Sequence, residues 1–280
     1  MGLRIRTNVG SLQAQRQLGL STDASKESIE KLSSGFRINK AADDAAGLAI
    51  SETLKAKVRS LGQARRNASD GVSMVQVAEG SMNEISSILI RLRELSTQAA
   101  SDTIGNMERA FTNREYTQLV DEIDRISNST EFNGTKLLKG SDGNEGLTQF
   151  SIHVGAGDAS VENVDNIIFD IDDLKIDAND VLQLGKEAEI GPIEISDDFS
   201  RETAAEKLTV IDTAINKINS SRATLGAKQS RLSSTINNLG IQIENMNSAN
   251  SRVRDVDFAA ETAASQNFHC RYSSMNGGIS

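Results

Sequence analysis

Apolar side chains recur at alternating steps of three and four residues through the last third of the chain. Only Arg222, Gln229 and Asn250 interrupt the series with polar side chains. Its apolar members are Leu208, Ile211, Ile215, Ile218, Leu225, Leu232, Ile236, Leu239, Ile243, Met246 and Val253. A seven-residue repeat of this kind lets a helix wrap around a partner helix. The pattern predicts one helix over about 203–255, roughly 80 Å long at 1.5 Å per residue.

Two more helical stripes lie in the first half of the chain. One fits residues 44 to about 100, and it contains Gly62, Gly71 and Gly80. Each glycine costs helix stability of about 1 kcal/mol relative to alanine, and each lets another backbone approach closely. A further helix fits 106–127. Because three apolar stripes need partners, the simplest arrangement packs them on one another.

The middle of the chain has a different pattern. Asn133-Gly134 is a tight-turn signal, and residues 148–154 alternate between apolar and polar as a half-buried strand does. Residues 166–171 and 190–195 are further strand candidates. Within 141–200 there are 15 Asp and Glu residues against two Lys and Arg residues. We therefore interpret 140–199 as a small, acidic, β-rich insertion between helices.

The first 40 or so residues have a helical composition but few apolar anchors. Such a segment buries too little apolar surface to offset its ordering entropy, so we expect it to be mobile until it meets a partner. The whole pattern predicts a mainly α fold: a long antiparallel helical bundle or coiled-coil rod with a small β-rich insertion.

Composition supports a thin helical protein and excludes several classes. Hydrophobic residues make up 38% of the chain, but it has eight Phe, two Tyr and no Trp, which are few rings for a thick core. No apolar run is long enough to span a membrane, and the start of the chain lacks the apolar core of a signal peptide. The net charge of −9, concentrated in the middle, argues against nucleic-acid binding.

Candidate catalytic and metal-binding groups are sparse. Cys270 is the single cysteine, which excludes an intramolecular disulfide, and His153 and His269 are the only histidines. Asp43-Asp44 fits the start of a helix better than an acid–base pair. Asp170, Asp172 and Asp173 resemble a calcium cluster, but Lys175 stands where an EF-hand needs glycine. We predict no catalytic, cofactor or metal site, and no enzyme.

Two other motifs have simpler interpretations. Gly155-Ala156-Gly157-Asp158 lacks the following Gly-Lys-Ser/Thr of a phosphate loop, so it fits a β-turn. Asn67 and Asn128 begin N-glycosylation patterns, which mean little without a secretory context.

Residues 30–51, EKLSSGFRINKAADDAAGLAIS, closely resemble the N-terminal signature of bacterial flagellin. Other stretches agree with the same family: TNVGSLQAQRQL at 7–18, NASDGVSMVQVAEGSMNEI at 67–85, RLRELSTQAA at 91–100, EFNGTKLL at 131–138 and RVRDVDFAAETA at 252–263. Together the resemblance covers roughly three quarters of the chain, about 1–140 and 200–263.

The resemblance implies a structural subunit that polymerises into the extracellular flagellar filament for motility. It implies export without a cleaved signal peptide through the flagellar type III apparatus, with an export chaperone as a partner. Two alternatives remain open: a flagellin-like protein at the hook–filament junction, and a cytosolic coiled-coil adaptor. Detection in sheared surface filaments separates the filament and junction hypotheses from the adaptor.

The resemblance also divides the chain into parts. These are an N-terminal inner-tube arm (1–43), N-terminal rod helices and a turn (44–139), the variable insertion (140–199), a long C-terminal rod helix (200–261) and an atypical tail (262–280). Our candidate anchors in the arm are Leu12, Leu18, Ile29 and Leu32, and we expect Leu32→Asp to abolish filaments while the rod stays folded. By resemblance, Arg91, Leu95 and Glu115 are candidate contacts for a host Toll-like receptor; their alternative is ordinary packing in the rod.

The tail departs from the family. Flagellins continue after the RDVDFAAE element with an apolar helix, whereas here TAASQNFHCRYSSMNGGIS follows Glu261 and the heptad spacing disappears. We expect that this tail cannot supply the usual terminal helix. The change suggests a shifted reading frame near Ala263-Ala264, with a divergent terminus as the alternative. Translating the other frames of the gene distinguishes the two.

Overall fold

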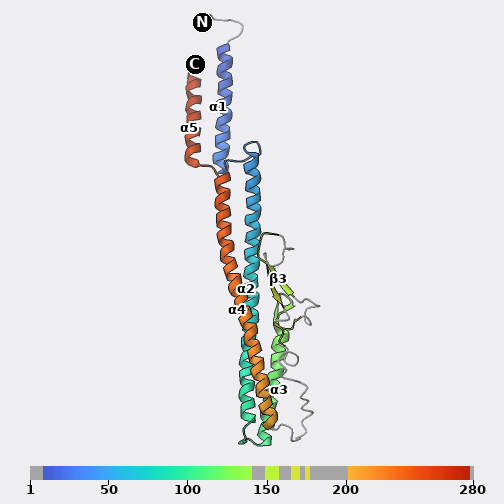
Figure 1. The fold of residues 1–280 in the computed structure, drawn as a ribbon. Helices are drawn as coiled ribbons and strands as arrows, with labels where there is room; N and C mark the ends of the chain where they lie inside the picture. The colour runs from blue at the N-terminus through green and yellow to red at the C-terminus, as the bar shows by residue number, and fades with distance from the viewer. Residues whose placement is uncertain (1–8, 141–148, 158–164, 171–173, 177–200, 278–280) are drawn as a thin grey trace. The chain divides into compact units, whose positions relative to one another are not determined.

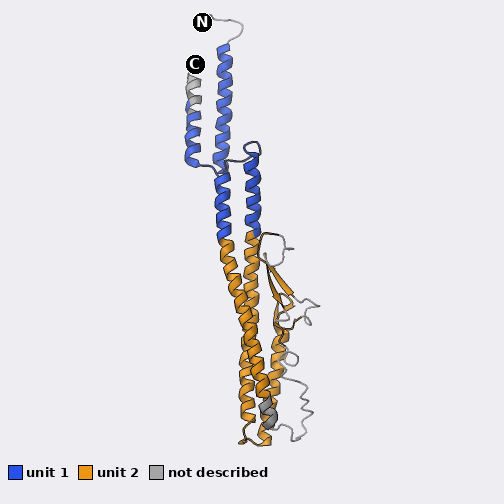
Figure 2. Ribbon diagram, viewed as in Figure 1, with its two compact units in different colours: residues 1–60, 241–280 blue, residues 61–240 orange. Residues whose placement is uncertain are grey.

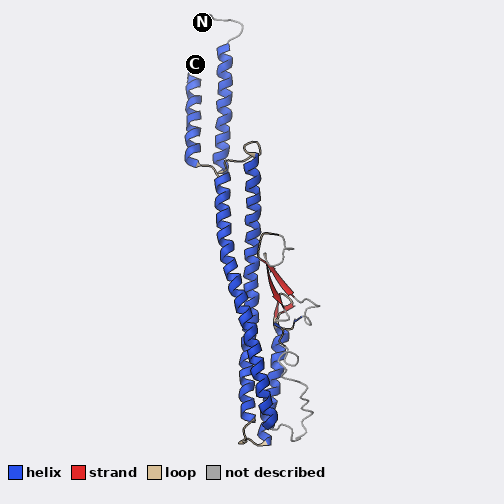
Figure 3. Cartoon of the chain, viewed as in Figure 1, coloured by secondary structure: helices blue, strands red, loops and turns tan. Residues whose placement is uncertain are grey.

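The computed structural model describes residues 9–140, 149–157, 165–170, 174–176 and 201–277 (Figure 1). Helices dominate these residues, and the strands are short (Figure 3). The elements in chain order are α1 (Val9–Ser34), α2 (Ala45–Ala99), α3 (Asn106–Ser129), β1 (Glu131–Phe132), β2 (Thr135–Lys136), β3 (Gln149–His153), β4 (Asn166–Asp170), α4 (Arg201–Arg254) and α5 (Phe258–Gly277). The mainly α class predicted from the sequence is confirmed.

The chain divides into two compact units (Figure 2). One unit combines residues 1–60 with 241–280, and the other comprises 61–240. Each unit contains part of α2 and part of α4, because both helices continue from one unit into the other. We call them the terminal unit and the core unit.

The core unit contains the main hydrophobic core. Buried side chains from α2, α3, both strands of the β3–β4 hairpin and α4 form one cluster within residues 68–232. The predicted heptad residues Ile218, Leu225 and Leu232 of α4 are each at most 1% exposed. Full burial of a Leu or Ile side chain contributes about 1.5–3 kcal/mol, so this seam stabilises the unit together with the buried residues of α2, α3 and the hairpin.

Two small antiparallel hairpins lie in the core unit. Asn133 and Gly134 both have positive φ, 52° and 80°, in the two-residue turn between β1 and β2, which confirms the predicted turn. In the second hairpin, Ile152 pairs with Ile167 and Phe150 with Phe169. The predicted strands at 148–154 and 166–171 are therefore confirmed, and the candidate at 190–195 lies outside the described residues.

Contacts from two helices hold the β3–β4 hairpin. The Lys228 ammonium of α4 donates to the Ile168 carbonyl at 2.6 Å and lies 4.8 Å from the centre of the Phe169 ring. The Asn67 amide of α2 donates to the His153 carbonyl at 3.0 Å. Lys228 therefore makes two contacts with β4, a hydrogen bond to its main chain and a cation–π contact with the Phe169 ring. Together these contacts position β4 on α4.

In the terminal unit, α1 and α5 lie side by side. The N-terminal segment that we expected to be mobile is helical over Val9–Ser34. Its end is marked by Gly35, whose φ of 74° suits a left-handed helix cap, and Gly35 donates from its N–H to the Lys31 carbonyl. The segment therefore has a neighbouring helix, α5, within its own chain, which the sequence analysis did not anticipate.

The tail also differs from expectation, since α5 continues to Gly277. The Asp257 carboxylate caps this helix by accepting from the N–H groups of Ala259 and Ala260, at 2.9 and 3.3 Å. The loss of the heptad nevertheless has a consequence: none of the α5 residues whose burial is described is buried. Capping and an alanine-rich first turn favour the start of this helix.

Candidate assembly surfaces

Helix α1 exposes several large apolar side chains. Val9, Leu12 and Leu20 are 59%, 56% and 59% exposed. At 100° per residue, these three fall within an arc of about 80° on the helix. We call them the α1 apolar face. Apolar side chains gathered on one face of a helix are typical of a surface that another protein covers.

The four predicted anchors do not share one environment. Leu12 and Ile29 are more than half exposed, whereas Leu18 and Leu32 are half-buried. Ile29 also lies outside the arc of the α1 apolar face. The sequence analysis did not select Leu20, although its offset of eight residues from Leu12 is compatible with a shared helical face.

The covered side of α1 combines small polar and apolar residues. Ser21 and Ser28, seven residues apart, are the buried residues of this helix, at 8% and 5% exposure. The Ser21 hydroxyl has no hydrogen-bond partner among the described residues. The half-buried Leu18 and Leu32 lie on the same side of the helix. Serine allows two helices to approach closely, and the two leucines add partial apolar burial.

The candidate receptor residues lie on α2 and α3. The Arg91 guanidinium donates to one Glu115 carboxylate oxygen from Nε at 2.9 Å and from Nη2 at 2.8 Å. Its Nη1 also pairs with Glu94 at 3.0 Å. These hydrogen bonds, first the one to Glu115, raise the pKa of Arg91. Side-chain exposures of 49% and 45% leave Arg91 and Glu115 accessible.

Leu95 differs from the other two candidates, because it is only 2% exposed. The structure therefore brings Arg91 and Glu115 together at the surface and places Leu95 in the core. For Leu95 this burial agrees with ordinary packing in the rod, which was the alternative to receptor contact at these three positions.

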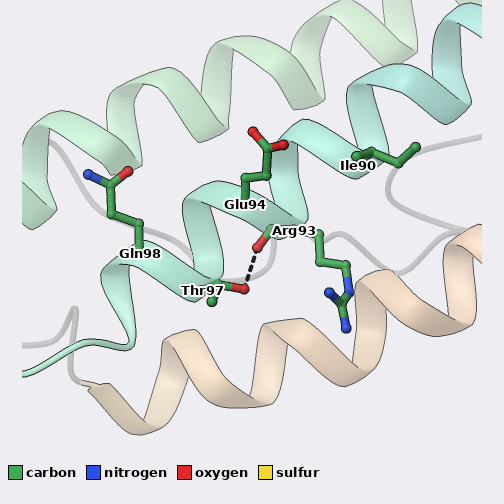
Figure 4. Close-up of a pocket in the computed structure, with 5 residues that line it drawn as sticks. All are labelled: Ile90, Arg93, Glu94, Thr97 and Gln98. Atoms are coloured by element: carbon green, nitrogen blue, oxygen red, sulfur yellow. Dashed lines mark hydrogen bonds between the residues drawn. The ribbon is translucent and has the colours of Figure 1, made fainter.

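Glu94, the second carboxylate that pairs with Arg91, lines a shallow groove of about 590 Å³ (Figure 4). Ile90, Arg93, Glu94, Thr97 and Gln98 line it, all from α2. Arg93 bridges to Asp212 of α4 at 2.7 Å, and this ion pair could not be read from the sequence spacing. Ile90 is 52% exposed in this groove and lies beside the charged side chains of Arg93 and Glu94.

Residues considered for other chemistry have structural roles. Asp43 accepts from the N–H groups of Asn39 and Lys40, both at 2.9 Å, and the bond from Lys40 is the main cause that lowers its pKa. Asp44 accepts from the Gly47 N–H at 2.9 Å, at the start of α2. Both aspartates therefore stabilise the entry into a helix, as predicted.

The remaining motif residues also have local partners. His153 lies 2.8 Å from Asn166 through Nδ1, and Asp165 accepts from the Gly157 N–H at 2.8 Å in the turn. Asp172 and Asp173 lie outside the described residues. Within the described part, no three His, Cys, Asp or Glu side chains gather as metal ligands, and no helix is long and apolar enough to cross a membrane.

Comparison with known proteins matches the two helical parts of the chain on either side of the acidic middle segment. The bacterial flagellin N-terminal helical region matches residues 5–142, and the bacterial flagellin C-terminal helical region matches 208–269. A flagellin of Bacillus subtilis strain 168 is 40% identical over 274 residues, covering 92% of this chain and 89% of that protein. A flagellin of Halalkalibacterium halodurans is 38% identical over 257 residues, with 92% and 87% covered.

A solved structure gives the same result. The crystal structure of Bacillus cereus flagellin is similar with a TM-score of 0.50 and 32% identity, and the match covers 66% of this chain and 94% of that one. The match to the C-terminal helical region extends as far as residue 269, so it includes part of the tail that departs from the expected pattern.

Proposed function

Because this chain belongs to the bacterial flagellin family and is a structural subunit of the flagellar filament, we propose that the α1 apolar face binds a neighbouring copy in that filament. The observation that carries the proposal is the exposure of Val9, Leu12 and Leu20 on one side of α1. Each such side chain contributes about 1.5–3 kcal/mol when another copy buries it fully.

The geometry of a filament favours this face. A filament grows when one surface of a subunit binds a different surface of the next, so that the contact never closes on itself. The α1 apolar face is rich in large apolar groups, whereas the side of α1 that is already covered contains Ser21 and Ser28. The large apolar side chains Val9, Leu12 and Leu20 are therefore available for contact with another copy.

Leu12→Asp tests the proposal. Leu12 is 56% exposed, so an aspartate there leaves the monomer folded and places a charge in the proposed contact. We expect seeded filament growth, followed by sedimentation and negative-stain microscopy, to be lost. The matched control is Gln15→Asp, which adds the same charge at an exposed polar position of α1 and retains growth. Normal growth of Leu12→Asp contradicts the proposal.

The resemblance supports a finer account of how the subunit reaches the filament. We propose passage through the flagellar type III apparatus with an export chaperone, and the five-part division given by the resemblance. The match of both family regions, with the 141–200 segment strongly acidic between them, supports this division. Secretion of the chain in a strain that lacks the apparatus tests this route, and we expect it to stop.

A second proposal concerns the host receptor. We propose that Arg91 and Glu115 contact a Toll-like receptor from adjacent helices, with Leu95 supporting them from the core. The exposure of the hydrogen-bonded pair favours this assignment. A receptor reporter assay tests the assignment. We expect Arg91→Ala to lose the receptor response and Arg114→Ala, an exposed control on α3, to retain it.

A further inference from the structure

The turn between β1 and β2 presents an asparagine and a glycine to solvent in a conformation that leaves both accessible. Asn133 precedes Gly134, and both have positive φ. Both residues are exposed, and a Cβ placed at Gly134 would meet no atom within 4 Å. Because glycine has no side chain, nothing shields its main-chain nitrogen from the side-chain amide of the residue before it.

Neither of these two groups is held by a hydrogen bond. Within the described residues, the Gly134 N–H takes part in no main-chain hydrogen bond, and the Asn133 side-chain amide has no partner. The hairpin ladder pairs Phe132 with Thr135, and the turn lies beyond this last pair. A reaction between the Gly134 nitrogen and the Asn133 side chain therefore breaks no hydrogen bond of the folded protein.

The hairpin is anchored at its base and short at its tip. The Leu137 N–H donates to the Thr130 carbonyl at 3.1 Å, and Leu138 is fully buried. Strands β1 and β2 comprise only two residues each, and a ladder of that length is marginal by itself. The main chain at the tip can therefore rotate until the Gly134 nitrogen reaches the Asn133 side-chain carbonyl carbon.

We propose that Asn133 is a site of spontaneous deamidation, a modification that needs only water. The Gly134 nitrogen loses its proton to solvent and attacks the Asn133 side-chain carbonyl carbon. A carbon–nitrogen bond forms in the main chain, the bond to the side-chain nitrogen breaks, and that nitrogen takes up a proton from solvent and leaves as ammonia. Water then opens the resulting cyclic imide at either of its carbonyls. The products are aspartate and isoaspartate, and no atom is oxidised or reduced.

Exposure alone does not create such a site, as Asn219 of α4 shows. Asn219 and the following Ser220 are also exposed, but both lie within a long helix. There the Ser220 N–H is committed to the hydrogen bond with the carbonyl four residues earlier, and the main chain is fixed. Asn219 is therefore the internal reference against which the reactivity of Asn133 is measured.

The modification changes the hairpin and leaves the helices in place. Isoaspartate adds a carbon to the main chain of a two-residue turn, which displaces the pairing of Phe132 with Thr135. Phe132 packs against the main hydrophobic cluster, so the change reaches the edge of the core. Both products also add a negative charge near Glu131. This inference concerns the single chain and does not depend on filament assembly.

Peptide mass spectrometry of the incubated full chain tests the proposal. The chain is incubated in water labelled with a heavy oxygen isotope, at several pH values from neutral upward. We expect the peptide with Asn133 to gain the mass of an amide-to-acid exchange with one labelled oxygen, at least about tenfold faster than the peptide with Asn219. The rate rises about tenfold per pH unit, because the Gly134 nitrogen must lose a proton. Asn276-Gly277, the other Asn-Gly pair of the sequence, is counted in its own peptide.

The matched variant is Asn133→Gly, which removes the reacting amide and keeps a residue that favours positive φ. We expect its hairpin peptide to stay unchanged on incubation, while its circular dichroism equals that of wild type. Conversion of Asn133 no faster than that of Asn219 overturns the proposal. Aspartate formed without isoaspartate also overturns it, because direct hydrolysis of the side chain passes through no cyclic imide.

Discussion

At the scale of single residues, Tyr116 is an unusual group in the core unit. Its hydroxyl is buried without a hydrogen-bond partner among the described residues, and the loss of water on burial raises the pKa of the phenol to about 12. The Lys207 ammonium lies 5.4 Å from the ring centre, and burial lowers the pKa of that lysine. The folded state therefore holds the proton of Tyr116 more tightly than the unfolded chain does.

Stability should consequently depend on alkaline pH through Tyr116. Its contribution is complete below pH 10, near the ordinary pKa of 10.0, and is lost as pH rises toward 12. Tyr116→Phe keeps the ring beneath Lys207 but removes the titrating group. We expect the free energy of unfolding of the variant to equal or exceed that of wild type at pH 7. As pH rises toward 12, we expect it to fall by up to about 3 kcal/mol less than that of wild type. Urea unfolding at several pH values measures both, and parallel pH curves contradict the prediction.

Residue environments were the part of the site that sequence patterns predicted least. The resemblance named Arg91, Leu95 and Glu115 together, but nothing in the spacing distinguished exposed Glu115 from buried Leu95. The bridge from Arg93 to Asp212 joins residues 119 positions apart, and such a pairing has no local signal. Burial and long-range ion pairs depend on how helices pack on one another. Periodicity predicts which face of a helix is apolar, but not which residues of another helix lie against that face.

At the scale of elements, Gly71 shows why one glycine of α2 is needed and another is not. A Cβ at Gly71 would overlap the Ile152 side chain of β3, whereas a Cβ at Gly80 would meet nothing within 4 Å. Another backbone was expected to approach closely at Gly62, Gly71 and Gly80. Among these, only Gly71 has neighbours within 4 Å of the Cβ position, and they are the side chains of Ile152 and Leu232. The hairpin therefore packs against α2 through the space that Gly71 leaves.

Alanine substitutions should separate these two glycines. Gly80→Ala gains helix propensity without a clash, and we expect the free energy of unfolding to rise by about 0.5–1 kcal/mol. Gly71→Ala gains the same propensity but displaces Ile152, so we expect a net loss of about 1–3 kcal/mol. Chemical denaturation followed by circular dichroism measures the free energy of unfolding of both variants. Equal changes for the two would show that Ile152 and the β3–β4 hairpin move away from the new methyl group without measurable cost.

Helix bounds were largely predictable because apolar periodicity sets them. The predicted ranges 44–100, 106–127 and 203–255 agree with α2, α3 and α4 within a few residues. Helices α1 and α5 were not anticipated as a pair, because neither has a sustained apolar stripe. The main-chain bonds between the links at residues 35–37 and 254–256 also leave no mark in a hydrophobic pattern.

At the scale of the whole molecule, the large buried cluster belongs to one unit, whereas exposed apolar side chains occur in both. The cluster lies entirely within residues 68–232 of the core unit. The terminal unit carries the exposed apolar side chains of α1 together with Phe36, Ile50 and Phe258, and the core unit exposes Val77, Ile90, Met107 and Phe111. The chain thus keeps most of its own stability in one unit and offers the proposed contact surface in the other.

A fragment comprising residues 45–254 should therefore fold alone. It retains the complete cluster and all three long helices, and it lacks only segments that bury little. We expect a cooperative thermal transition by circular dichroism within a few degrees of that of the full chain, and no seeded filament growth. A gradual, non-cooperative loss of helix signal would show that the terminal helices support the core.

The pairing of residues 35–37 with residues 253–256 also has a consequence for the order of chain synthesis. Arg37 and its acceptor Val253 are 216 residues apart, so a ribosome completes most of the protein before the partner of Arg37 exists. Closing so long a loop is entropically costly and belongs to the late stages of folding. Any product of interrupted translation that ends before residue 253 can still build much of the core, yet its first helix has no anchor. Completion of the polypeptide is thereby a condition for presenting both ends correctly.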